Sequence, residues 1–209
     1  MIDISAIDFA KSGGLVPAIV QHARTRQVLM LGFMNEDAVR QTVDTGLVTF
    51  FSRSRDRLWV KGETSGNTLR LEAIRLDCDR DTLLVEAMPA GPVCHLGTTG
   101  CFEDGEAPGV GFLEALSDVV RARRKADPKE SYVARLLASG PLKAAQKVGE
   151  EGVEMALAAA AQDDAALTEE AADLVFHLLV ALESRGVSLS DVVETLRARH
   201  ASSFAITER

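Results

Sequence analysis

The sequence predicts an α+β protein, in which a β-rich, metal-binding N-terminal domain precedes an all-α helical bundle. Up to about residue 102 the chain consists of short runs of β-favouring residues separated by Gly, Asn, Asp and Arg. After residue 111 the apolar residues follow a helical period, with many alanines. Residues 103–111 lie between these two regions and form a polar stretch that contains three Gly and one Pro. We expect domains at 1–104 and 112–209, joined by a linker at 105–111.

The first half is expected to contain six strands and one helix. The helix follows Asn35, a good N-cap, and Glu36 and Asp37 place negative charge in its first turn. It is expected to end near Gly46. The strands are expected at 15–20, 28–33, 47–52, 58–61, 69–76 and 83–88.

The second half is expected to contain five helices. Asp127-Pro128 stops the first, and Gly140-Pro141 ends the second while starting the third. Thr168 is predicted as the N-cap and Gly186 as the C-cap of the fourth. The helices are expected at 112–126, 131–138, 142–162, 168–185 and 190–201.

Composition and charge narrow the range of functions. The chain has 209 residues, 46% hydrophobic and 26% charged, which is ordinary for a globular protein. The net charge of −8 belongs mostly to residues 103–209, which carry 12 Lys and Arg against 19 Asp and Glu. That half would repel nucleic acid, so we expect no nucleic-acid partner. Residues 1–20 lack the pattern of a secretory signal, and no apolar run is long enough for a membrane span, so we expect a cytoplasmic protein.

Three thiols and three carboxylates gather within 25 residues of the first half. Thiolates are suitable ligands for zinc, and clustered carboxylates for magnesium or calcium. Three thiolates leave the fourth tetrahedral position to water, as in catalytic zinc sites. The cysteines are Cys78, Cys94 and Cys101, and the carboxylates around the first of them are Asp77, Asp79 and Asp81.

These residues also have simpler interpretations. Cys78 alone would be a small buried apolar residue. A Cys94–Cys101 disulfide conflicts with the odd number of cysteines and the lack of an export signal, and the spacing differs from that of a redox pair. The acidic run could be a solvated strand end or an incomplete calcium loop, but it lacks the required glycine and distal glutamate. Together the two clusters favour a metal enzyme.

The second half carries two acidic pairs at helical spacing. Glu151 and Glu154 are three residues apart and so share a helix face, with Lys147 one turn earlier. Glu170 and Asp173 repeat the spacing on the next helix. Two antiparallel helices would bring four carboxylates together, which requires neutralising cations.

The alternative is a solvated acidic stripe. All residues from 171 to 176 except Asp173 are apolar, which indicates that part of this acidic face is enclosed by neighbouring helices. We therefore favour a magnesium site. His177, one turn after Asp173, is interpreted as a core histidine and left out of the metal set.

These motifs resemble two known families. Residues from about 16 to 102 resemble phosphoribosyl-AMP cyclohydrolase, through QVLMLGFMN at 27–35, FSRSR at 51–55, WVKGETSGN at 59–67 and both metal-ligand clusters, the acidic run around Cys78 and the segment with Cys94 and Cys101. Residues from about 112 to 200 resemble phosphoribosyl-ATP pyrophosphohydrolase, a helical relative of nucleotide-cleaning pyrophosphatases with Glu-x-x-Glu and Glu-x-x-Asp motifs. The tandem is similar to a known fusion that catalyses steps two and three of histidine biosynthesis.

The resemblance implies a bifunctional hydrolase with Zn²⁺ and Mg²⁺ as cofactors. The C-terminal domain would release pyrophosphate from phosphoribosyl-ATP, and the N-terminal domain would add zinc-bound hydroxide to carbon six of the purine in phosphoribosyl-AMP. Members are intertwined homodimers with zinc ligands from both chains. The implied ligands are Cys78, Cys94 and Cys101 for zinc, Asp77, Asp79 and Asp81 for one magnesium, and Glu151, Glu154, Glu170 and Asp173, with Glu150 as a fifth, for the other.

The residues themselves are compatible with this chemistry. On a regular strand, Cys78 would point away from the face shared by Asp77, Asp79 and Asp81, so the zinc ligands of one chain need not converge. The intertwined dimer that the resemblance implies would resolve this geometry, and we expect a zinc site completed across the subunit boundary. His95 either moves a proton or orients a ligand. The loop at 61–67 either offers backbone N–H groups to a phosphate or is a simple hairpin turn. The candidate substrate-binding residues are Arg53, Arg55, Lys61, Thr64, Ser65, Gly66 and Asn67, with Lys143 and Lys147 for pyrophosphate.

The same residues are compatible with other roles. Arg53 and Arg55 could be ordinary surface residues, and Trp59 is assigned to the core rather than to base stacking. A zinc deaminase fused to a general nucleotide pyrophosphatase is disfavoured, since the His-x-Glu and Pro-Cys-x-x-Cys signature is absent from the sequence. A structural zinc domain joined to a helical dimerisation module is the non-catalytic alternative.

Overall fold

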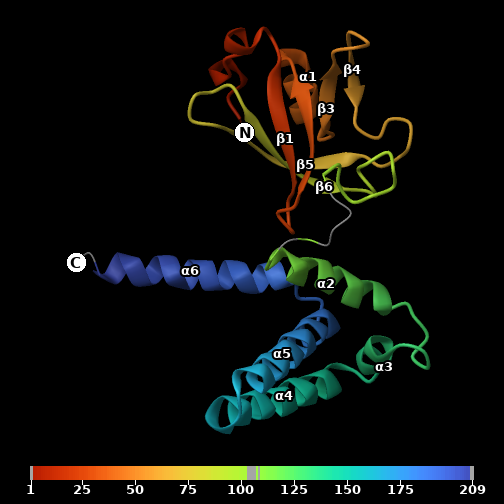
Figure 1. The fold of residues 1–209 in the computed structure, drawn as a ribbon, viewed down its shortest axis with the longest axis vertical. Helices are drawn as coiled ribbons and strands as arrows, with labels where there is room; N and C mark the ends of the chain where they lie inside the picture. The colour runs from red at the N-terminus through yellow and green to blue at the C-terminus, as the bar shows by residue number, and fades with distance from the viewer. Residues whose placement is uncertain (1, 103–106, 108, 208–209) are drawn as a thin grey trace. The chain divides into compact units, whose positions relative to one another are not determined.

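The computed structural model describes residues 2–102, 107 and 109–207, with side chains as far as residue 201. The chain forms two compact units, Met1–Phe112 and Leu113–Arg209. Within the described residues, the regular elements of the first are mainly strands and those of the second are helices (Figure 1), so the predicted α+β class is confirmed. Of the predicted linker at 105–111, residues 105, 106 and 108 lie outside the described residues.

The first unit is organised around a four-stranded sheet with strand order β2-β1-β6-β5 (Figure 1). The hairpin of β1 and β2 is antiparallel, as is that of β5 and β6, and parallel pairing of β1 with β6 joins the two. A separate antiparallel hairpin, β3 and β4, follows helix α1. The strands are β1 (Val16–His22), β2 (Val28–Met34), β3 (Thr49–Ser52), β4 (Arg57–Val60), β5 (Leu69–Leu76) and β6 (Leu83–Pro89). The helical elements are η1 (Ile4–Ala6), η2 (Ala10–Ser12) and α1 (Glu36–Thr45).

The core of this unit follows from strand alternation. Val16, Ala18 and Val20 of β1 point to one face and are fully buried. The β3–β4 hairpin is held against the sheet by Phe50, whose ring covers Gly32 of β2. A Cβ atom at Gly32 would lie 2.4 Å from this ring, so only glycine permits the approach.

Both predicted ends of α1 are confirmed. The Asn35 side chain accepts a hydrogen bond from the Ala38 N–H at 2.9 Å, and Gly46 follows the helix with φ of +70°.

The described part of the second unit contains five helices, as predicted. They are α2 (Gly111–Arg123), α3 (Tyr132–Ala138), α4 (Pro141–Ala161), α5 (Asp164–Ser184) and α6 (Leu189–Thr207). The N-cap predicted at Thr168 is wrong. Asp163 caps α5 by accepting from the Ala166 N–H at 2.9 Å, and the Thr168 hydroxyl donates to the Asp164 carbonyl at 2.6 Å inside the helix. The predicted C-cap is off by one residue, since Arg185 is the cap and Gly186 follows it with φ of +70°.

The helical unit has a small core. Helices α4 and α5 pack side by side, and α3 contacts both (Figure 1). The buried apolar cluster consists of Val120, Leu136 and Val180. Large apolar side chains on α4 remain exposed, among them Leu142 at 85% and Val153 at 60%. No helix in the described part of the chain is both long and apolar enough to span a membrane.

Candidate active sites

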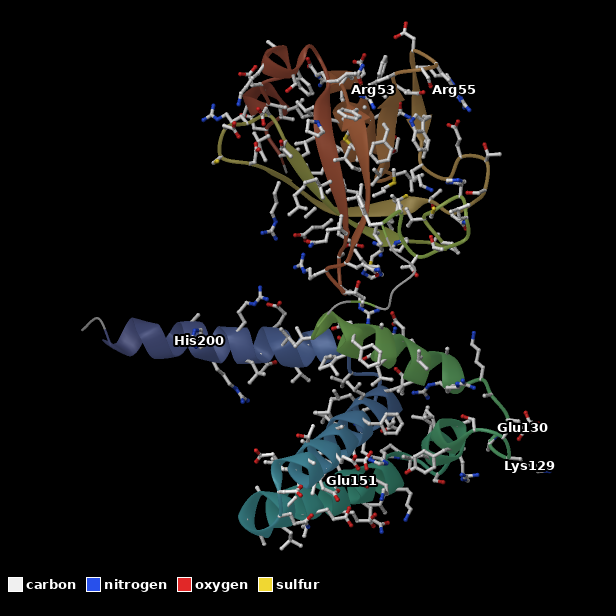
Figure 2. All side chains as sticks on the ribbon, in the orientation of Figure 1. Arg53, Arg55, Lys129, Glu130, Glu151 and His200 are labelled. Atoms are coloured by element: carbon white, nitrogen blue, oxygen red, sulfur yellow. The ribbon has the colours of Figure 1, made fainter. Side chains whose placement is uncertain are left out.

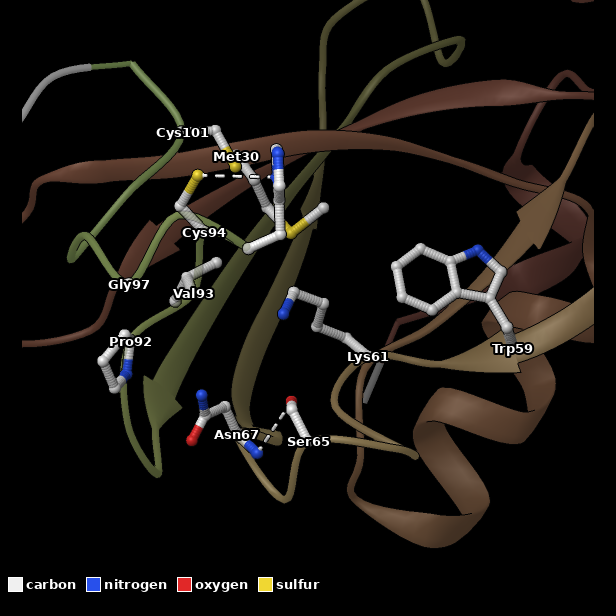
Figure 3. Close-up of a pocket in the computed structure, with 11 residues that line it drawn as sticks. Met30, Trp59, Lys61, Ser65, Asn67, Pro92, Val93, Cys94, Gly97 and Cys101 are labelled. Atoms are coloured by element: carbon white, nitrogen blue, oxygen red, sulfur yellow. Dashed lines mark hydrogen bonds between the residues drawn. The ribbon is translucent and has the colours of Figure 1, made fainter.

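A cavity of about 540 Å³ lies in the first unit, at the end of the sheet where β6 finishes (Figure 3). Its walls come from β2, from β4 and the loop after it, and from the segment that follows β6. The lining residues are Met30, Trp59, Lys61, Ser65, Asn67, Pro92, Val93, Cys94, His95, Gly97 and Cys101. Two of the three cysteines and four of the predicted substrate or catalytic residues therefore share one cavity.

Backbone hydrogen bonds bring Cys94 and Cys101 together. The Cys94 N–H donates to the Thr98 carbonyl at 3.2 Å and the Gly97 N–H donates to the Cys94 carbonyl at 3.0 Å, which closes a tight turn. The Cys101 N–H then donates to the Leu29 carbonyl at 2.6 Å, fixing the end of the loop on β2. Both thiols consequently face the cavity (Figure 3).

The two thiols have opposite electrostatic surroundings. Hydrogen bonds from the Leu96 N–H and the Thr98 hydroxyl lower the pKa of the Cys94 thiol below its ordinary value. Burial raises the pKa of the Cys101 thiol, and the nearby Cys94 adds to the rise. The imidazole of His95 is next to this pair of thiols, with its Nδ1 atom 3.8 Å from the Cys94 sulfur.

The loop after β4 contributes three polar side chains to the cavity, Lys61, Ser65 and Asn67 (Figure 3). Its sharp start depends on Gly62, which has φ of +86° and where a Cβ atom would lie 2.3 Å from the Asn67 carbonyl oxygen. Thr64 and Gly66 belong to the same loop but are exposed and do not line the cavity.

The two predicted arginines lie outside the cavity lining. Arg53 and Arg55 are in the turn between β3 and β4 (Figure 2). The Arg53 guanidinium lies 3.9 Å from the centre of the Phe33 ring, a cation–π contact. The sequence assigns Trp59 to the core rather than to base stacking. Its ring packs against the core, with its centre 5.4 Å from that of the Phe50 ring, and it also lines the cavity.

The acidic run around Cys78 lies between two strands, as the predicted strands at 69–76 and 83–88 imply, so the alternation considered for a regular strand does not apply to it. Strand β5 ends at Leu76, and residues 77–82 form the turn into β6. Asp77 Oδ1 accepts the N–H groups of Asp81 at 3.0 Å and Thr82 at 3.1 Å, which folds the run back on itself. Carboxylate oxygens of Asp77, Asp79 and Asp81 then lie within 4.8 Å of one another, so alternation on a strand is unnecessary for clustering.

Sequence reasoning missed Lys11, a residue of η2 that lies against this cluster. Its Nζ atom is 2.5 Å from Asp79 Oδ2 and 2.6 Å from Asp81 Oδ2. These carboxylates raise the pKa of Lys11, and Lys11 lowers that of Asp79. A single lysine far away in the sequence gives no pattern by which this contact could have been found.

Cys78 lies at the opposite end of the sheet from the other thiols. It belongs to the β5–β6 turn, whereas Cys94 follows the far end of β6. The seven residues of β6 span about 20 Å at the rise of an extended strand. Among the described residues, the three cysteines do not form a common group of metal ligands.

The helical unit brings together Glu151, Glu154 and Glu170, whose carboxylate oxygens lie within 4.8 Å of one another. Glu151 is buried where α4 packs on α5 (Figure 2). Asp173 and Glu150 are exposed and lie outside this group. Mutual repulsion is visible in the pKa of Glu154, which the charges of Glu151 and Glu170 raise along with burial.

Lysines flank the same cluster. Lys147 Nζ is 2.7 Å from Glu151 Oε1 and 2.9 Å from Glu150 Oε2, and it lowers the pKa of both carboxyls. Lys143 lies one helical turn before Lys147 on α4, and its Nζ atom donates to Gln146 Oε1 at 2.9 Å. Both predicted pyrophosphate-binding lysines thus lie on α4, and Lys147 is in direct contact with carboxylates of that helix.

Comparison with known families agrees with this division of the chain. The family model of phosphoribosyl-AMP cyclohydrolase matches residues 30–103, and that of phosphoribosyl-ATP pyrophosphohydrolase matches residues 113–200. The β-rich unit with its thiol-lined cavity and the helical unit with its acidic cluster therefore constitute a two-part hydrolase of phosphoribosyl nucleotides.

Two relatives match this chain over most of their own length. The "Histidine biosynthesis bifunctional protein HisIE" of Escherichia coli is 54% identical over 194 residues, covering 93% of this chain and 95% of the relative. The protein of the same name from Photobacterium profundum is 52% identical over 202 residues, covering 94% and 98%. The chain belongs to this bifunctional HisIE family and carries both hydrolytic activities of histidine biosynthesis.

Proposed function

We propose that ring opening of phosphoribosyl-AMP takes place in the thiol-lined cavity, at a zinc ion held by Cys94 and Cys101 of one chain and Cys78 of a second copy. The supporting observation is the separation of the thiols. Zinc–sulfur bonds are about 2.3 Å long, so zinc-binding sulfurs must lie within a few ångströms of each other. Cys94 and Cys101 share a cavity, whereas Cys78 is on the turn at the other end of the sheet.

The donors present fit the proposed ions. Thiolates prefer zinc, and the all-carboxylate groups Asp77/Asp79/Asp81 and Glu151/Glu154/Glu170 fit magnesium. Asp173 and Glu150 would join the second group as further ligands. When bound, zinc lowers the pKa of water and supplies the hydroxide that opens the purine ring.

The chain's own residues prepare the cavity for this step. Hydrogen bonds to Cys94 favour its thiolate, the form that binds metal. His95, next to Cys94 and exposed, is placed to carry a proton between the cavity and solvent. The apolar surfaces of Met30, Trp59 and Val93 exclude water from around a purine.

A shared zinc site predicts complementation between two inactive chains. When Cys78→Ser and Cys101→Ser proteins are mixed under conditions of subunit exchange, some heterodimers acquire one fully intact thiol set. We expect each variant alone to lack ring opening and the mixture to recover part of it, measured by phosphoribosyl-AMP consumption. Absence of recovery, with heterodimers demonstrated by mass spectrometry, would mean that each chain builds its own site.

We propose that the loop at 61–67 holds the substrate phosphate. Lys61 supplies a positive charge, and Ser65 and Asn67 supply polar groups on the same side of the cavity (Figure 3). Thr64 and Gly66 lie in the same turn, where their backbone N–H groups can assist, and Arg53 and Arg55 add positive charge on the neighbouring hairpin.

Gly62→Ala tests this role. The added methyl group would collide with the backbone of Asn67, so the loop must open and its polar groups must move. Misplacement of positioning groups by about 1 Å can cost about 100-fold in rate, and we expect a loss of this size in ring opening with pyrophosphate release unchanged.

Gly66→Ala is the matched control for this substitution. Gly66 also has positive φ, +78°, but a methyl group there meets nothing within 4 Å. The two variants therefore share backbone strain and differ in the collision. Equal kinetics for the two would contradict a specific role of the loop geometry.

We propose that the helical unit, residues 112–209, releases pyrophosphate at the Glu151/Glu154/Glu170 cluster, with Lys143 and Lys147 binding the phosphates. Residues 1–104 form the cyclohydrolase domain. A homodimer follows from the shared zinc site. The small core of the helical unit and its exposed Leu142, Val153 and Leu157 support pairing of this half as well.

A further inference from the structure

Tyr132 and His177 form a hydrogen-bonded pair next to the acidic cluster of the helical unit, and the chemistry above makes no use of them. Tyr132 is the first residue of α3, and His177 lies in α5. The Tyr132 hydroxyl is 2.9 Å from His177 Nε2. The contact therefore joins the short helix α3 to the α4–α5 pair.

The partners of the imidazole fix the positions of its protons. Nδ1 lies 2.9 Å from the backbone carbonyl oxygen of Asp173, which can only accept, so Nδ1 carries a hydrogen. In the neutral ring, Nε2 then accepts from the Tyr132 hydroxyl. The same Nδ1 lies 3.5 Å from Glu151 Oε1, which places the ring beside this carboxylate.

Packing holds the ring in this orientation. His177 is only 6% exposed and Glu151 only 4%, so both are shielded from water. The Phe176 ring meets the imidazole edge-on at 5.2 Å, and the Tyr132 ring does so at 6.0 Å. Glu151 is also the buried member of the three-carboxylate group.

We propose that the Tyr132–His177 pair is a positioning device for Glu151, which sets the orientation of this carboxylate before a cation binds. This inference rests on the metal site proposed for the helical unit. The tyrosine fixes the imidazole, the imidazole Nδ1 and Lys147 Nζ both lie close to Glu151 Oε1, and the carboxylate is thereby held toward Glu154 and Glu170. Neither residue needs to contact substrate.

Substitutions at His177 separate this role from simple packing. His177→Asn keeps an N–H donor at the position of Nδ1, while His177→Leu fills the space without a donor. Tyr132→Phe keeps the ring contacts and removes only the hydroxyl, and it provides a second test if His177→Leu fails to fold. Changes in groups that orient metal ligands cost about 10–100-fold in metal affinity.

The experiment measures Mn²⁺ binding to the full chain by electron paramagnetic resonance, together with the Mg²⁺ concentration for half-maximal pyrophosphate release. An Asp79→Asn background removes the contribution of the other acidic cluster. We expect His177→Leu to weaken Mn²⁺ binding about 10–100-fold and Tyr132→Phe to weaken it in the same direction. The Mn²⁺ affinity of His177→Asn should stay closer to that of the unsubstituted protein.

Two results would overturn the proposal, and they differ. If His177→Leu and Tyr132→Phe bind Mn²⁺ as tightly as the unsubstituted protein does, the pair contributes only packing. The same conclusion holds if His177→Leu binds Mn²⁺ as tightly as His177→Asn. If Glu151→Gln also leaves Mn²⁺ binding unchanged, the metal site itself is wrong, and the positioning role fails with it.

Discussion

Cys101→Ser should reduce ring opening of phosphoribosyl-AMP more than about 100-fold, because even changes in groups behind the metal ligands cost 10–100-fold. Pyrophosphate release from phosphoribosyl-ATP should remain nearly unchanged, since Cys101 belongs to the first compact unit and the acidic helices to the second. The measurement is a two-step assay with each substrate supplied separately, on protein whose zinc content has been quantified.

Two further variants sharpen this prediction. Cys78→Ser should show the same loss, although Cys78 lies at the far end of the sheet from the cavity in its own chain. Thr99→Ser, an exposed change in the same loop as Cys101, should be neutral. Full ring opening by zinc-quantified Cys101→Ser protein would refute the assignment of Cys101 as a ligand.

Glu151→Gln and Asp79→Asn should produce opposite losses. Each change replaces a carboxylate by an amide of the same shape, which removes one charge from one acidic group. We expect Glu151→Gln to remove pyrophosphate release and spare the conversion of supplied phosphoribosyl-AMP, and Asp79→Asn to do the reverse. Both effects should exceed about 100-fold, as expected for direct ligands rather than their supporting groups.

The controls for this pair are exposed carboxylates outside both acidic groups. Glu169→Gln on α5 and Asp44→Asn on α1 remove the same charge and should leave both activities unchanged. Circular dichroism should show that every variant is folded. The separation of the two activities would be refuted if folded Glu151→Gln and Asp79→Asn each lost both of them.

Local sequence patterns were sufficient for most of the secondary structure. The side chain of Asn35 and the conformational freedom of Gly46 act on the backbone next to them, so both ends of α1 followed from the sequence. The same reasoning failed at Thr168, because several residues near the start of α5 can cap a helix and Asp163 does so. Strand β5 was placed correctly, but the acidic run after it forms a turn.

The chemistry of the candidate sites was also visible in the sequence, because metal preference depends on the ligand atoms and not on the fold. Thiols and clustered carboxylates indicated zinc and magnesium, and helical spacing placed Glu151 and Glu154 on one face. His177 was correctly assigned to the interior, where both ring nitrogens have partners.

The sequence alone therefore determined the two-part organisation and the approximate position of the elements, since each depends on residues close together in the chain. Only the tertiary structure showed that Cys94 and Cys101 share a cavity while Cys78 lies at the other end of β6, that Lys11 pairs with Asp79 and Asp81, and that Tyr132 reaches His177. These contacts join residues distant in sequence. Strand register and helix packing decide such contacts, and no local spacing encodes them.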